Sequence, residues 1–118
     1  MKTLIIVFSL FLAGTSYSQT REVVSFNAEK MENAVVLTWS PSVTPETNHF
    51  EIQKSDDGIN WKVIALMFPY EDGSISHTYT YSDKLATGAN VHYRIRQIDI
   101  NKKEIFSQIK MINVLANK

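Results

Sequence analysis

Three histidines are the side chains of this 118-residue sequence that could best support metal binding or acid–base chemistry. His49 and His92 lie in segments that alternate polar and apolar residues, so both could face outward from neighbouring strands, with Glu51 as the nearest carboxylate. A protein zinc site uses three or four converging ligands, and the sequence offers no obvious further ligand for this pair. We therefore favour solvated surface histidines, His77 included, over a metal site.

No other pattern indicates catalysis. No serine stands in a G-x-S-x-G nucleophile motif, and the absence of cysteine excludes thiol chemistry. The acidic pairs Asp56-Asp57 and Glu71-Asp72 are each followed directly by glycine and lack the spaced oxygen ligands of a calcium loop, so we interpret both as turns. We expect no enzymatic activity, no cofactor and no bound metal.

A basic stripe made of His92, Arg94 and Arg96 occupies one face of a strand-like segment. Cross-strand pairing, with Glu51 opposite as the partner, explains such a stripe more simply than an anion-binding role does. The anion-binding role is kept as the alternative.

Three aromatic residues form the candidate binding surface: Trp61, Phe68 and Tyr70. Phe68 and Tyr70 flank a proline in a connection, where large apolar side chains are less expected. Exposed rings of this kind could bind a sugar ring or a protein partner. The alternatives are that Trp61 packs over the edge of the sheet, that Phe68 caps the open end of the core and that Tyr70 shields it.

The first 18 residues predict export. A single lysine precedes an apolar run that is shorter than the ~20 residues needed to span a bilayer, and small residues follow it. Cleavage after Ser18 would leave a mature chain of 100 residues beginning at Gln19, secreted or periplasmic and without a membrane span. Without Lys2 that chain has 11 basic and 12 acidic residues, and a net charge of −1 gives no reason to expect nucleic acid as a partner.

The mature chain, residues 19–118, is predicted to be one all-β domain. Short alternating segments recur between turn signals such as Asp57-Gly58, and no window shows an apolar stripe of helical period. About seven strands, with turns spaced by roughly 8–12 residues, indicate an antiparallel immunoglobulin-like sandwich. Apolar residues on both faces of the last strand predict a bulge near Lys110, and the preceding turn, which lacks glycine, is expected to place Asn101 in a left-handed conformation.

Three stretches together resemble a fibronectin type III domain: "LTW", which ends at Trp39, "HFEIQKSDDGINWKVI", and "LATGANVHYRIRQID", which contains Leu85 and Tyr93. The resemblance extends from about Val23 to Val114 and is strongest to modules found in secreted proteins of the Bacteroidetes group. It implies a seven-stranded sandwich with Trp39, Leu85 and Tyr93 in the core, and a Tyr93 hydroxyl that bonds backbone a few residues upstream.

These features predict an exported, non-catalytic module that binds protein or acts as a spacer in the cell envelope. Binding would use aromatic loop residues or an open sheet edge. The first alternative is a carbohydrate-binding module, for which Trp61 and Tyr70 should be exposed and coplanar. The second is a small secreted hydrolase, which no acid–base or nucleophile set supports.

Overall fold

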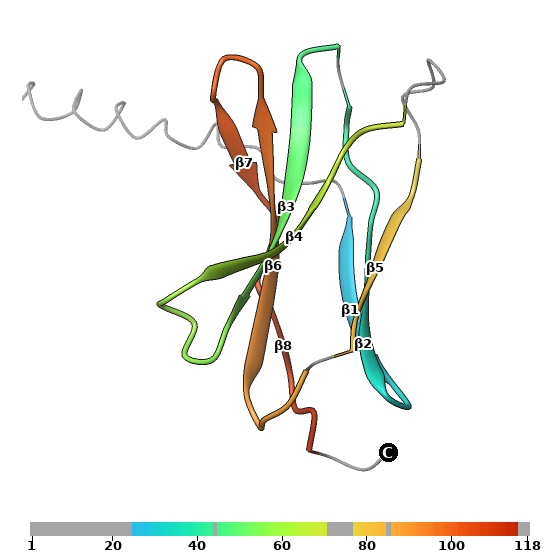
Figure 1. The fold of residues 1–118 in the computed structure, drawn as a ribbon, viewed down its shortest axis with the longest axis vertical. Coiled ribbons are helices and arrows are strands. Elements are labelled where there is room, and N and C mark those ends of the chain that lie inside the picture. The colour runs from blue at the N-terminus through green and yellow to red at the C-terminus, as the bar shows by residue number, and fades with distance from the viewer. Residues whose placement is uncertain (1–24, 44, 71–76, 85, 116–118) are drawn as a thin grey trace, which may run out of the picture.

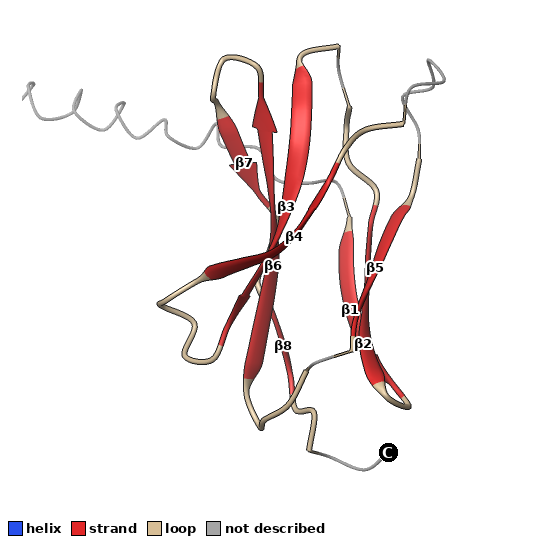
Figure 2. Cartoon of the chain, viewed as in Figure 1, coloured by secondary structure: helices blue, strands red, loops and turns tan. Residues whose placement is uncertain are grey.

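The computed structural model describes residues 25–43, 45–70, 77–84 and 86–115, so the expected signal peptide, Leu85 and the pair Glu71-Asp72 lie outside the described residues. The described residues contain strands and no helix, which confirms the all-β prediction (Figures 1 and 2). They therefore include no helix long and apolar enough to cross a membrane. The strands are β1 (Phe26–Met31), β2 (Ala34–Trp39), β3 (Thr47–Ser55), β4 (Lys62–Met67), β5 (Tyr79–Asp83), β6 (Val91–Asp99), β7 (Glu104–Phe106) and β8 (Lys110–Ile112).

Two antiparallel sheets lie face to face and form a sandwich-like fold (Figure 1). The three-stranded sheet has the order β1-β2-β5. The five-stranded sheet has the order β4-β3-β6-β7, and β8 pairs with a further part of β6. Strand alternation decides which side chains enter the space between the sheets: in β3, Phe50 and Ile52 are fully buried while His49 and Glu51 point to the outer face.

The core is an apolar cluster to which both sheets contribute. Trp39 on β2 and Tyr93 on β6 are both fully buried in it. The Trp39 ring stacks on Tyr79 with 5.7 Å between ring centres and meets Phe50 edge-on at 6.0 Å. Because Phe50 belongs to the other sheet, this aromatic cluster joins the two layers. Among the described residues, the buried apolar ones are Phe26, Val35, Leu37, Trp39, Phe50, Ile52, Tyr79, Val91, Tyr93 and Ile95.

A buried polar triad also connects the sheets. The Tyr93 hydroxyl donates a 2.6 Å hydrogen bond to Asp83 Oδ2, and Lys54 Nζ lies 2.8 Å from the same oxygen. Lys54 and Tyr93 belong to the five-stranded sheet, whereas Asp83 ends β5 in the other sheet. The sequence-based expectation of a backbone acceptor for Tyr93 is therefore wrong, because a carboxylate ten residues upstream takes that place. Burial and this carboxylate raise the pKa of Tyr93 far above its usual value.

The expected last strand is divided into β7 and β8, which is why the described residues form eight strands rather than seven. Arg96 pairs with Phe106 and Tyr93 with Lys110, so three steps along β6 match four along the last strand. The extra residue confirms the predicted bulge. Ser107 stabilises it: its hydroxyl accepts a hydrogen bond from the Ile95 N–H at 2.8 Å, in the place of a backbone carbonyl.

The turn between β6 and β7 differs from its prediction by one residue. Lys102, with φ of 68°, and not Asn101, adopts the left-handed conformation. The Asp99 N–H bonds the carbonyl of Lys103, which leaves a three-residue loop, and loops of this length place their third residue in that conformation. Asp99 Oδ1 also accepts hydrogen bonds from the N–H groups of Asn101 and Lys103, which holds the loop without glycine.

Candidate functional site

The outer face of the five-stranded sheet, which is the side turned away from the core, carries most of the side chains that the sequence singled out. On β3 and β6, register places Glu51 opposite Arg96, and Gln53 opposite Arg94. On the edge strand β4, Leu66 pairs with Glu51 and Val63 pairs with Gln53. Rows of side chains therefore cross this face from an apolar edge at β4 to a charged centre at β6.

Phe68 extends the apolar edge of this face. Its side chain is 62% exposed, and its ring centre lies 6.0 Å from that of His49, the outward-facing histidine of β3. Leu66 is 53% exposed and Val63 is 48% exposed. We call Val63, Leu66 and Phe68 the apolar stripe. The alternative that Phe68 caps the core does not hold, because most of its side chain remains in solvent.

The Tyr70 side chain is partly exposed and partly packed against the core. Its ring stacks on the buried Tyr79 with 4.8 Å between ring centres and an interplanar angle of 18°, and its N–H donates to the Tyr79 hydroxyl at 3.2 Å. The His77 ring lies 4.3 Å away. Although 51% of Tyr70 is exposed, one face of the ring shields the open end of the core. Its role is therefore partly structural, as the shielding alternative expected.

Trp61 lies at the other end of β4 from Phe68, so the three aromatic candidates do not form one cluster. Its indole packs against Arg94, whose guanidinium carbon lies 4.2 Å from the Trp61 ring centre and 4.3 Å from that of Phe106. Arg94 Nε also donates a 2.7 Å hydrogen bond to Gln53 Oε1. We call Trp61, Arg94, Phe106 and Gln53 the arginine clamp. The sequence alone gave no sign that Phe106 belongs to it.

Arg96 has entirely different surroundings. Its Nε donates to Glu104 Oε1 at 2.7 Å and its Nη1 donates to Glu51 Oε1 at 3.0 Å. Partial burial opposes the charge of Arg96, but these two carboxylates outweigh it and raise the pKa of the guanidinium. The predicted pairing of Glu51 with the basic stripe is thus confirmed for Arg96. Arg94 has no carboxylate within ion-pair distance among the described residues.

The histidines do not assemble a metal site in the described part of the chain. His49 pairs with Ile98 and His92 pairs with Ser55, so the two imidazoles lie at opposite ends of the β3–β6 ladder. His49 and Ser55 are six residue steps apart along β3, or about 20 Å at the usual rise of a strand. Within the described ranges no three histidine or acidic side chains form a possible metal-binding group. The two-histidine site considered from the sequence is therefore wrong.

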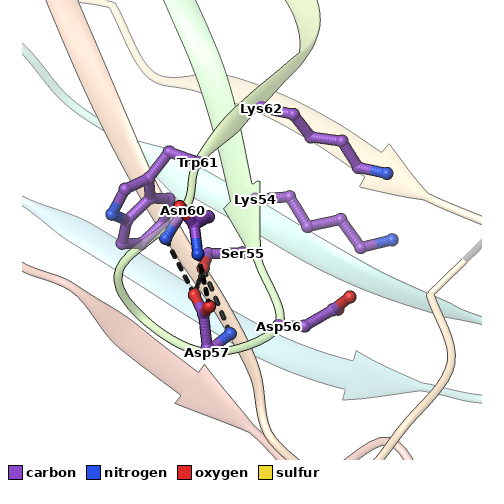
Figure 3. A pocket seen from close by; sticks show the side chains of 7 residues that line it. All are labelled: Lys54, Ser55, Asp56, Asp57, Asn60, Trp61 and Lys62. Carbon is purple, nitrogen blue, oxygen red and sulfur yellow. Dashed lines mark hydrogen bonds between the residues drawn. The ribbon is translucent and has the colours of Figure 1, made fainter.

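The hairpin between β3 and β4 confirms the turn interpretation of Asp57-Gly58. Asp57 Oδ1 accepts hydrogen bonds from the N–H groups of Ile59 and Asn60, both at 2.8 Å. Its Oδ2 accepts one from the Asn60 side chain at 2.7 Å (Figure 3). These donors hold the pKa of Asp57 well below its usual value. Gly58 has φ of 78°, the conformation for which glycine is needed.

A small pocket of about 260 Å³ lies beside this hairpin, and Trp61, Lys54 and Lys62 are among the residues that line it (Figure 3). Lys54 and Lys62 are directly paired in register, and their side chains run parallel in Figure 3. Like charges opposite one another disfavour a sheet, but Asp83 neutralises Lys54. Lys54 therefore has a structural role, and the two lysines of this pocket do not by themselves indicate a ligand.

Comparison with known proteins supports the fold alone. No protein-family model and no curated protein matches the chain. Among solved structures, the chain is similar to part of a pectate lyase from Pectobacterium carotovorum, with a TM-score of 0.58 and 18% identity, over 79% of this chain and 26% of that one. It is also similar to part of a β-1,2-glucanase from Parabacteroides distasonis, with a TM-score of 0.57 and 20% identity, over 84% of this chain and 14% of that one.

Proposed function

We propose that the chain is an exported, non-catalytic domain of the immunoglobulin-like, fibronectin type III-like kind, which binds a protein partner through the outer face of its five-stranded sheet or spaces its neighbours. The strand orders β1-β2-β5 and β4-β3-β6-β7 support the fold assignment, together with the resemblance carried by Trp39 and Tyr93. The split last strand is the difference from a simple seven-stranded arrangement.

The apolar stripe is the observation that carries this proposal. Single exposed apolar residues are normal on a protein surface, but neighbouring ones on the same edge of a sheet mark a site of interaction. Val63, Leu66 and Phe68 have exposed fractions of 48%, 53% and 62%, and all three border the polar rows of β3 and β6. Protein interfaces combine an apolar patch with a polar rim, and both are present on this face.

Export follows in this proposal from the first 18 residues, whose pattern is that of a signal peptide. The mature protein should begin at Gln19, and an intact-mass measurement of the exported form checks this. Recovery of a chain that retains Met1 in the membrane fraction would contradict it.

The hydrolase alternative has less support. His49 Nε2 lies 3.8 Å from Glu51 Oε2, which is the nearest approach to a catalytic pair. Glu51, however, already accepts hydrogen bonds from Gln53 and Arg96, and the described residues place no nucleophile against the imidazole. Assays of the mature domain with generic ester, peptide, glycoside and phosphate substrates should show no turnover. Turnover that is abolished by His49→Ala or Glu51→Gln would establish an enzyme instead.

The carbohydrate-binding alternative draws on the names of the two similar structures, a pectate lyase and a β-1,2-glucanase. A sugar platform needs exposed, coplanar rings. Trp61 packs against Arg94 and Tyr70 packs against Tyr79, and β4 separates the two aromatic residues. The protein-binding role is therefore favoured by the geometry.

A capture experiment tests the proposed function. The mature domain is immobilised and used to retain proteins from an envelope extract, and it is compared with the double variant Leu66→Ser, Phe68→Ser. Because both side chains are largely exposed, the double variant should keep its folding stability and lose capture. The matched control is Ile59→Ser, which removes an equally apolar side chain, 77% exposed, from the hairpin tip. Equal capture by the double variant and the parent would remove this face from consideration.

A further inference from the structure

Two arginines on one strand face differ in how their charge is balanced. Arg96 donates to two carboxylates, those of Glu51 and Glu104. Arg94, two residues earlier on β6, donates through Nε to the neutral amide oxygen of Gln53. The Arg94 side chain forms no ion pair and no other hydrogen bond with any described residue. The described part of the fold therefore leaves this cation without a carboxylate at ion-pair distance.

The clamp holds this cation in one place. The rings of Trp61 and Phe106 pack against the guanidinium, and Gln53 fixes its Nε edge. Its two Nη groups have no protein acceptor among the described residues, and neither is a buried atom without a partner. They therefore reach solvent and present a rigid pair of N–H donors. A planar fork of this kind matches the two oxygens of a carboxylate, and little side-chain entropy is left to lose on binding.

Partial burial within the clamp also destabilises the charged form of Arg94 while it has no paired anion. Loss of hydration lowers the pKa of the guanidinium, although the more distant Glu104 opposes that effect. A carboxylate from a partner would restore the missing counter-ion at a site where water screens the charges less than at an open surface.

We propose that Arg94 is the charged anchor of the partner-binding face and accepts an aspartate or glutamate side chain of a protein segment that lies across the apolar stripe. The inference rests on the proposed function, because it names the chemistry of the same face. Gln53 lies between Val63 and Arg94 in one row across β4, β3 and β6, so two strand spacings, about 10 Å, separate the apolar and charged parts. Three residues of an extended segment span that distance.

The charges around the clamp favour a ligand with one carboxylate flanked by apolar residues over a ligand with many negative charges. Glu51 and Glu104 lie on the same face, and the mature chain has a net charge of −1. These negative charges repel a run of phosphates or uronates but leave room for one carboxylate at Arg94. Charge complementarity thus favours a protein segment over nucleic acid or an acidic polysaccharide.

Defined peptides test the clamp without knowledge of the natural partner. The probes are a blocked seven-residue peptide that alternates leucine with glutamate and its twin with glutamine in place of glutamate. The readout is the NMR signal of the Arg94 Nε–H during titration of the mature domain. We expect the glutamate peptide to shift this signal and to bind at least about tenfold more tightly than its twin, because the fork pairs with a charged acceptor.

Four variants distinguish the contribution of the clamp to peptide binding from the contributions of general charge and of the apolar stripe. Arg94→Gln should abolish the preference for glutamate, and Arg94→Lys should reduce it because the charge remains and the fork is lost. Lys84→Gln removes the same charge from an exposed position on the other sheet's edge and should leave the preference intact. Leu66→Ser should weaken both peptides alike.

The outcomes distinguish this inference from the proposed function. The clamp would be overturned if the two peptides bound equally and binding were weakened by Leu66→Ser but not by Arg94→Gln. The apolar stripe would then remain as the binding surface. Absence of binding by either peptide at millimolar concentration would also overturn the clamp, and the capture experiment would still decide the proposed function. Tighter binding of a short uronic-acid oligomer than of the glutamate peptide would overturn it in favour of a carbohydrate ligand.

Discussion

Replacing Lys54 with methionine should lower the free energy of unfolding by about 3–5 kcal/mol, the usual cost of breaking a buried ion pair. Lys54 Nζ lies 2.8 Å from Asp83 Oδ2, and the two side chains are only 12% and 6% exposed. Methionine keeps most of the apolar stem of lysine but removes the ammonium group that pairs with the Asp83 carboxylate. The Tyr93 hydroxyl still donates to Asp83, so we expect a value near the lower end of the range.

Urea unfolding of the mature domain at neutral pH measures this cost, read as a shift of the midpoint at unchanged slope. Lys62→Met is the matched control, because Lys62 is the register partner of Lys54 but is exposed and makes no ion pair with a described residue. It should change stability by no more than about 0.5 kcal/mol. The reasoning fails if both variants behave alike, since the triad would then not connect the two sheets energetically.

Three other substitutions probe the core and the hairpin. Trp39→Ala should cost about 3–5 kcal/mol in the same urea assay, because it empties the centre of a fully buried aromatic cluster, and a loss below about 0.5 kcal/mol would mean that the indole does not pack there. Tyr93→Phe should cost about 1.5–3 kcal/mol at neutral pH through loss of a hydrogen bond to a charged group. Because burial and Asp83 raise the pKa of Tyr93 in the folded state, its contribution is complete below the unfolded value of about 10 and is lost as pH rises above it. Stability of the parent should therefore fall more steeply above pH ~10 than that of Tyr93→Phe, and parallel curves would contradict the assignment. Gly58→Ala should cost about 1–2 kcal/mol, because φ is 78° and the new Cβ would lie 3.3 Å from Nε2 of His92, whereas an unchanged urea midpoint would show that the turn relaxes.

The elements of the fold that were predictable from the sequence are those whose side chains alternate between core and solvent. The pattern of β3 and β6 assigned Phe50, Ile52 and Tyr93 to the core because one face of each strand is apolar and the other is polar. The bulge before Lys110 was predictable for the same reason, since apolar residues changed face along the last strand. The acceptor of Tyr93 was not predictable, because Asp83 reaches it across the space between the sheets and periodicity within a strand does not report such contacts.

For the candidate site, the sequence could predict only which face of its strand each side chain occupies. Alternation places Arg94 and Arg96 on one face of β6, and a single pairing of Glu51 with Arg96 is enough to place the neutral Gln53 opposite Arg94. A charge balance of the two rows would then have identified Arg94 as the arginine without a counter-ion. The aromatic part could not follow from such reasoning. Phe106 pairs with Arg96 in register, yet its ring packs against Arg94, one row away. Trp61, which packs against the same guanidinium, lies just before the first residue of β4. Those two contacts depend on the twist of the sheet and on the path of the Asp57-Gly58 hairpin, and they convert an ordinary surface arginine into a fixed cation.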